Sequence, residues 1–123
     1  MKKSNYYFKF EDLKVYQKSI EFGELINKQI ETFTKNETYK LSSQFIRAAD
    51  SIAFNIAEGS GSTDAKFNRY LKMAWDSCHE CVAASTKARL RNYITFEPDE
   101  ENRKVITEIS KMISALRRHL NNK

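Results

Sequence analysis

The chain contains only three glycines and one proline in 123 residues. A small all-β protein needs many tight turns, and glycine and proline supply most of them. Their scarcity therefore excludes a small all-β fold and predicts long helices joined by few connections. The length corresponds to one domain. With 41% hydrophobic and 30% charged residues, the composition is that of a globular protein that can bury a core without a disulfide or metal staple.

Apolar residues at helical spacing mark four amphipathic segments, at about residues 11–33, 39–58, 64–93 and 98–121. Polar or turn-forming residues separate them. This pattern predicts an all-α, up-down-up-down antiparallel four-helix bundle that forms a single domain over residues 1–123. We expect Gly59 to end the second helix in a left-handed conformation, and Thr63 to cap the third.

The first of these segments has an unusually wide apolar face, which covers roughly half of the helix circumference at about 100° per residue. Two interpretations follow. The helix is wedged between two neighbours of its own chain, or it also faces another subunit. The residues concerned are Leu13, Val15, Tyr16, Ile20, Phe22, Ile26, Ile30 and Phe33.

The formal net charge of +5 is concentrated at the C-terminal end of the chain. Residues 103–123 hold six basic side chains and one acidic one, whereas the preceding 102 residues sum to zero. Five of these cations lie on the arc opposite the apolar face of the helix. They form either a solvated surface or a phosphate-binding stripe for nucleic acid. The five are Arg103, Lys104, Lys111, Arg117 and Arg118.

The inventory of reactive residues favours no enzyme and no metal or other cofactor. Cys78 and Cys81 form one ligand pair, whereas structural zinc needs four ligands, and both fall on the apolar stripe of their helix. We therefore expect buried, unreactive cysteines. Ser77 and His79 lie about 200° apart on the same helix and cannot form a catalytic pair. Two cysteines, no secretory signal and no apolar run of membrane-spanning length predict a cytoplasmic protein without a membrane partner.

One segment resembles a known family signature. Ser51–Gly59 resembles the S-I-x-x-N-I-A-E-G motif of the bacterial four-helix bundle proteins encoded in 23S ribosomal RNA intervening sequences. Phe10–Lys18 is similar to the family opening F-x-D-L-x-V-W-Q, with Tyr16 in place of Trp. Gln44 and Arg47 fall in a segment similar to its Q-x-R-R-A-A motif, in which Ile46 replaces an Arg.

The resemblance implies a homopentamer with no enzymatic activity. It also implies kinship with the accessory protein of diversity-generating retroelements, which has a basic, nucleic-acid-binding surface. The motif residues, to which the resemblance assigns a structural role, are Gln44, Arg47, Asn55, Glu58 and Gly59. We expect Asn55 and Glu58 to hydrogen-bond a loop or another helix, because buried polar groups need partners. A catalytic pair is the alternative for these two residues.

Three functions remain open from the sequence. The first is a non-enzymatic, oligomeric protein that binds nucleic acid, RNA in preference, through the basic face of the last helix. The second is a scaffold that recruits an acidic protein partner without touching nucleic acid. The third is an enzyme or small-ligand binder that uses a cleft between subunits. The predicted partners are thus further copies of the chain, RNA or DNA, and an acidic protein.

Overall fold

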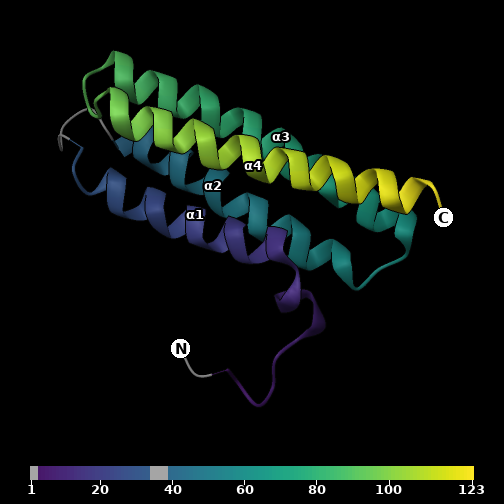
Figure 1. Cartoon of the computed structure of the whole chain (residues 1–123). Coiled ribbons are helices and arrows are strands. Elements are labelled where there is room, and N and C mark those ends of the chain that lie inside the picture. Colours follow the sequence, from purple (N-terminus) through teal and green to yellow (C-terminus); the bar gives the residue numbers. More distant parts are fainter. Residues whose placement is uncertain (1–2, 34–38) are drawn as a thin grey trace.

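The computed structural model describes residues 3–33 and 39–123 and shows four long helices. A short 3-10 helix, η1 (Lys9–Asp12), comes first. It is followed by α1 (Lys14–Ile30), α2 (Tyr39–Ser60), α3 (Asp64–Leu90) and α4 (Phe96–Asn121) (Figure 1). Each helix runs antiparallel to the next, and α2 packs against both α1 and α3. The predicted all-α four-helix bundle is confirmed, and no strand occurs within the described residues.

The core mixes large side chains with many alanines. Phe22, Phe45, Ile52 and Leu71 are almost completely buried, and each contributes about 1.5–3 kcal/mol by leaving water. Where α2 meets α3, small residues let the two backbones approach closely, which makes this the most extensive helix contact of the bundle. These buried small residues are Ala48, Ala49, Ala53, Ala74, Ala84 and Ala88.

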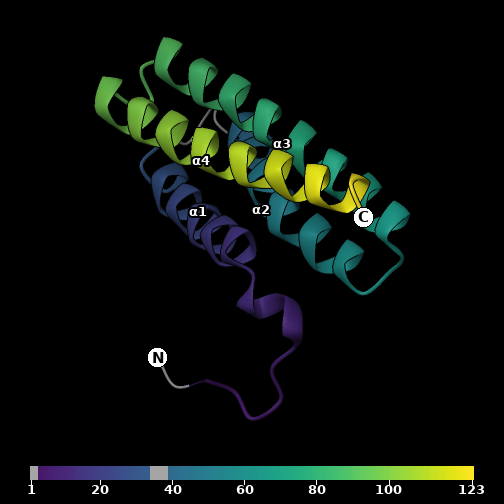
Figure 2. The ribbon, with the colours of Figure 1, turned by 45° about the vertical axis from the view of Figure 1, so that its right-hand side comes forward.

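The first helix starts later than the sequence suggested. Leu13 is extended, with ψ 123°, and separates η1 from α1. The carboxylate of Glu11 accepts the backbone N–H of Phe8 at 2.7 Å, so this acidic residue caps η1 instead of starting α1. The ring of Phe10 packs edge-on against Tyr16 with 5.0 Å between centroids. These contacts hold the base of an N-terminal segment that otherwise extends away from the bundle (Figures 1 and 2).

The wide apolar face of the first segment is largely covered by the chain itself. Val15, Phe22 and Ile26 are buried, and Tyr16 packs against the core. Ile20 is the exposed large apolar side chain of α1. The single bundle therefore accounts for most of this face, as expected for a helix wedged between neighbours of its own chain.

The expectation of a left-handed Gly59 is wrong. No described glycine has a positive φ, and α2 continues through Gly59 to Ser60. A Cβ at Gly59 would lie 2.6 Å from the Cβ of Tyr70 and 3.0 Å from the ring of Phe67. Glycine is needed here because α3 approaches the last turn of α2 too closely for a side chain. The left-handed residue is Asn92, with φ 63°, which ends α3.

The predicted cap of α3 is confirmed. The side chain of Thr63 accepts the backbone N–H of Lys66 at 3.2 Å. This hydrogen bond satisfies one of the free donors in the first turn of the helix, and an N-cap of this kind contributes about 1 kcal/mol. It fixes where α3 starts after the short connection from α2.

We expect Gly59→Ala to destabilise the protein. The added methyl would meet a Cβ that is fixed to the backbone of α3, so the two helices must separate, at a cost of roughly 1–3 kcal/mol. Gly61→Ala is the matched control, because a Cβ there meets nothing within 4 Å. Thermal unfolding followed by circular dichroism should show a lower Tm for Gly59→Ala alone. Equal Tm values for both variants would contradict the close approach.

Candidate nucleic-acid interface

The five cations predicted on α4 fall into two groups. Arg103 and Arg117 lie on the edge of α4 that faces α3, and both are half-buried. Arg103 Nε donates to both carboxylate oxygens of Asp99 at 3.2 Å, and its guanidinium also donates to Thr86 of α3. Arg117 Nε donates to Asn68 Oδ1 of α3 at 2.7 Å. These two arginines therefore help to attach α4 to α3.

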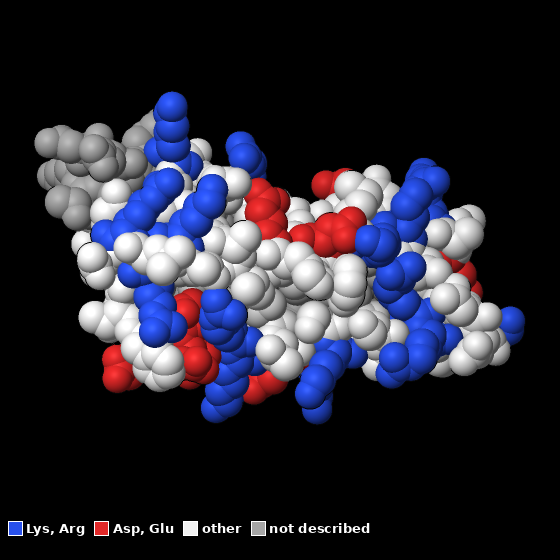
Figure 3. Space-filling model, turned by 90° about the horizontal axis from the view of Figure 1, so that it is seen from above, with Lys and Arg blue, Asp and Glu red and all other residues white. Residues whose placement is uncertain are grey.

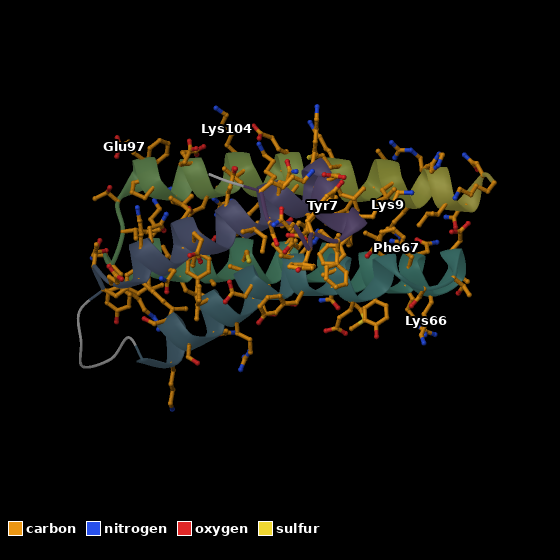
Figure 4. All side chains as sticks on the ribbon, turned by 90° about the horizontal axis from the view of Figure 1, so that it is seen from below. Tyr7, Lys9, Lys66, Phe67, Glu97 and Lys104 are labelled. Carbon is orange, nitrogen blue, oxygen red and sulfur yellow. The ribbon has the colours of Figure 1, made fainter. Side chains whose placement is uncertain are left out.

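The other three cations, Lys104, Lys111 and Arg118, form a row on the outer side of α4. All three are exposed, and no ion pair involves them within the described residues. They recur every seventh residue, so they fall within about 40° of one another around the helix and roughly 10 Å apart along it. We call them the α4 row. Figure 4 shows the Lys104 side chain pointing away from the bundle.

The surface around the row is not uniformly basic. On the face seen in Figure 3, Lys and Arg side chains gather toward both ends of the molecule, and acidic side chains lie between them. On the α1 side of the row, Glu108 is paired with Lys18. The sequence predicted a stripe of five cations. In the structure, only the three of these that form the α4 row are exposed and free of ion pairs among the described residues.

A buried polar network beside Arg103 joins three helices. Asp99 is fully buried and accepts a hydrogen bond from Ser85 Oγ at 2.7 Å. Asn102, also fully buried, donates to Ser85 Oγ at 3.0 Å. The side-chain amides of Asn102 and Gln29 bond each other at 2.7 and 2.9 Å. The network therefore connects α1, α3 and α4. The sequence analysis did not identify this network, and the spacing of Asp99, Asn102 and Arg103 on one helix was the available signal.

The pKa of Asp99 is held below its usual value. Burial alone would raise this pKa, but hydrogen bonds from Ser85, Arg103 and Arg89, together with the positive charge of Arg103, outweigh that effect. The charged carboxylate is thus the form that the fold stabilises. A depressed pKa means that this stabilisation is present above the unfolded value of about 3.9 and is lost as pH falls through the lower folded value.

We expect Asp99→Asn to lower the free energy of unfolding at pH 7 by roughly 2 kcal/mol, because hydrogen bonds to a charged group are lost. The variant should also lose stability less steeply than the wild type between pH 4 and pH 2. Urea unfolding across a pH series measures both effects. Asp76→Asn is the matched control, because Asp76 is exposed and pairs only with Lys72 in an i,i+4 pair worth about 0.5 kcal/mol or less. If the stability of Asp99→Asn and of the wild type changed in parallel with pH, this would contradict a depressed pKa for Asp99.

One motif residue of α2, Asn55, takes part in a polar cluster with Ser51 and with Ser77 of α3. Asn55 Nδ2 donates to the Ser51 carbonyl at 2.8 Å and to Ser51 Oγ at 3.1 Å. Ser51 Oγ lies 2.7 Å from Ser77 Oγ of α3. The cross-helix bond is therefore made by Ser51, and the expectation that Asn55 reaches another helix is corrected. Glu58 is exposed and makes no hydrogen bond or ion pair within the described part of the chain.

The other two motif residues lie earlier on α2. Arg47 is exposed and Gln44 is half-buried. No side-chain hydrogen bond joins either of them to the polar cluster around Asn55 among the described residues, which bring no nucleophile and base together there. The cluster can therefore align α2 with α3, which is a structural task.

Cys78 and Cys81 are completely buried, as predicted. Burial raises the pKa of Cys78 to about 12 and raises that of Cys81 still further, so neither forms a thiolate near neutral pH. His79 turns outward and its Nδ1 lies 2.9 Å from the Trp75 carbonyl. Among the residues that the structure describes, no group of three or more potential metal ligands is found.

A family model described as 23S rRNA-intervening sequence protein matches residues 11–115. The chain belongs to this family. The match confirms the resemblance drawn from the motif around Asn55. A similar solved structure is the crystal structure of a protein of unknown function from the S23 ribosomal protein family of Bacteroides thetaiotaomicron. It is 27% identical, with a TM-score of 0.76 over 82% of this chain and 95% of that chain.

No curated protein matches the chain. None of the described helices is both long and apolar enough to cross a bilayer.

Proposed function

We propose that this member of the intervening-sequence family is a non-enzymatic protein that binds nucleic acid, RNA in preference, as a homo-oligomer in the cytoplasm. The observation that carries the proposal is the α4 row. Lys104, Lys111 and Arg118 are aligned, exposed and free of ion pairs among the described residues. The family resemblance supports nucleic acid as the partner, because it implies kinship with an accessory protein that has a basic, nucleic-acid-binding surface.

The spacing of the row suits a phosphate backbone. A line of cations with roughly 10 Å between neighbours contacts a strand at intervals and reads no base edges. Such binding releases counterions, so its affinity falls steeply as salt rises and depends little on sequence. Arg103 and Arg117 contribute less, because each already has a hydrogen-bond partner in the bundle.

We expect the triple variant Lys104→Gln, Lys111→Gln, Arg118→Gln to weaken RNA binding and to reduce the slope of log affinity against log salt by roughly 2–3. A gel shift or fluorescence anisotropy series from 50 to 300 mM salt measures this. The matched control replaces Lys28, Lys40 and Lys87, which are exposed on other helices, and removes the same charge. It should leave the slope nearly unchanged.

Equal effects of the two triple variants would contradict the α4 row as the binding surface. Wild-type protein that binds neither RNA nor DNA at 50 mM salt would contradict the proposed function. The same cations would then favour the alternative, a scaffold that docks an acidic protein segment.

The outer surface of α2 and α3 supports self-association. The Ser51–Ser77 contact sets the register of these antiparallel helices, which places Phe54, one turn from Ser51, across from Met73, one turn from Ser77. Phe54 is 57% exposed and Met73 is 47% exposed. Large neighbouring apolar side chains on a polar surface are typical of a contact between proteins. The family resemblance suggests that five copies assemble.

Light scattering should give a mass of about 72 kDa for a homopentamer of the 14.4 kDa chain. We expect Phe54→Glu to lower this mass, because a charge at the centre of an apolar interface is costly to bury. Phe96→Glu is the control, since Phe96 is equally exposed but lies at the start of α4. A wild-type monomer at micromolar concentration would contradict the oligomer, and an unchanged mass for Phe54→Glu would contradict this surface.

A further inference from the structure

An open pocket lies where the N-terminal segment meets the connection between α2 and α3. Its volume is about 500 Å³, which falls in the range of small-ligand sites. Phe8, Phe10, Leu13 and Phe67 form its apolar walls. Lys9 and Ser60 are polar members of the lining, and no acidic residue lines it.

The segment leading into this pocket exposes aromatic rings beside lysines. Tyr6 is 87% exposed and Phe8 is 66% exposed. Lys3 Nζ lies 3.6 Å from the ring centroid of Tyr7 and covers one face of that ring. An isolated exposed aromatic needs no explanation, but three in succession on a polar segment mark a surface for a partner.

The charges around the pocket favour an anionic partner. Lys9 lines the pocket, and Lys66 directly precedes Phe67 on α3. Figure 4 shows Lys9 and Phe67 near each other, whereas the Lys66 side chain points away from them at the outer edge of α3. Both lysines are exposed, and neither takes part in an ion pair within the described residues. Of the carboxylates that precede α1, Glu11 accepts the Phe8 N–H and Asp12 pairs with Lys3.

The pocket is also close to the end of the α4 row. Asn121, near the end of α4, accepts a hydrogen bond from Asn68 of α3 at 2.6 Å. Lys123 pairs with Asp64 at 3.4 Å in the first turn of α3. The last turn of α4 is therefore held against the first turn of α3, which carries Lys66 and Phe67. The C-terminal end of the row thus lies near the part of α3 that carries Phe67.

We propose that this pocket and the aromatic segment before it bind unpaired bases of a single-stranded nucleic acid, with Lys9 and Lys66 contacting the flanking phosphates. Flat exposed rings next to cations are the means by which proteins bind single strands without sequence preference. A base enters between Phe8 and Phe67, and Tyr6 offers an open ring to the next base. The hydroxyl of Ser60, which donates to the Ala57 carbonyl at 3.0 Å, keeps its lone pairs available to a base amino group.

The inference rests on the proposed function and narrows it from nucleic acid to single strands. A duplex presents no unstacked base and is stiff over about 150 base pairs, so it cannot turn from the row on α4 into the pocket. A single strand can make this turn. Binding by the pocket therefore predicts a preference for single strands over duplexes, whereas binding by the α4 row alone predicts no such preference.

The test compares a fluorescein-labelled 12-nucleotide oligo(U) RNA with the same RNA paired to oligo(A), by fluorescence anisotropy. We expect the wild type to prefer the single strand. Phe8→Ser should weaken single-strand binding roughly tenfold and leave duplex binding unchanged, because the stacking surface is lost. Phe8→Leu keeps apolar volume without a flat ring and should also weaken it. Phe96→Ser is the control for an exposed aromatic elsewhere, and circular dichroism checks that each variant folds.

Two results separate this inference from the proposed function. Equal binding of single strand and duplex, unchanged in Phe8→Ser but weakened by loss of the α4 row, would overturn the pocket alone. If Phe8→Ser abolished single-strand binding and the triple variant of the α4 row had no effect, the pocket would be supported as the binding site. The α4 row would then be contradicted as a binding surface.

Two further results overturn the pocket by other routes. Absence of any binding by the wild type would overturn the proposed function and the pocket together. A change of mass in light scattering for Phe8→Ser, with single-strand binding unaffected, would identify a second copy of the chain as the occupant and overturn the nucleic-acid assignment.

Discussion

The close approach of α2 and α3 determines most of the remaining geometry. Small residues along both helices, and Gly59 at the last turn of α2, let the two backbones lie against each other. The Ser51–Ser77 contact then fixes their register. Once α3 is fixed, its first turn supports the end of α4. Its Phe67 side chain completes the pocket between the N-terminal segment and the bundle. The exposed pair Phe54 and Met73 follows from the same register.

The buried carboxylate of Asp99 determines which cations of α4 are free to contact a partner. Asp99 is held in the charged form by hydrogen bonds, and Arg103 is one of its partners. An arginine that neutralises a buried charge cannot leave it without a large cost, because an unpaired charge would remain inside the protein. Lys104 is the next residue, but it lies about 100° further around the helix and faces solvent. Of these two adjacent cations, Arg103 therefore stabilises the fold, and Lys104 is free to contact a partner.

The regular part of the fold could be predicted from the sequence, and the departures from regularity could not. Helical spacing locates four segments, and Thr63 is identifiable as a cap from local chemistry alone. The apolar pattern runs through Leu13 without interruption, so the break before α1 is invisible in it. The conformation of Gly59 depends on how near α3 comes, which is a tertiary property. The predicted helix ends differ from the observed ones by at most three residues, which leaves the bundle topology unchanged. The contacts of Leu13 and Gly59, in contrast, decide where the pocket forms.

Only part of the candidate site could be predicted, because the rest also depends on tertiary contacts. A helical wheel places all five cations of α4 on one arc, but it does not show that Arg103 and Arg117 lie on the edge next to α3. The pocket combines residues 8–13 with residues 60–67. Residues 3–8 have no periodicity, and the family match begins at residue 11, so neither periodicity nor the family match singles out this segment.

The α4 row and the pocket would contribute to binding in different ways. Three exposed cations per chain give an attraction that salt screens, since interactions beyond about 8 Å are largely lost at physiological ionic strength. Stacking on aromatic rings is much less sensitive to salt. One chain with both surfaces would therefore bind a single strand modestly. In an oligomer, a strand held by one copy meets the next at high effective concentration, so repetition of the two surfaces would raise the overall affinity without any new contact. The proposed self-association would thus strengthen the proposed nucleic-acid binding.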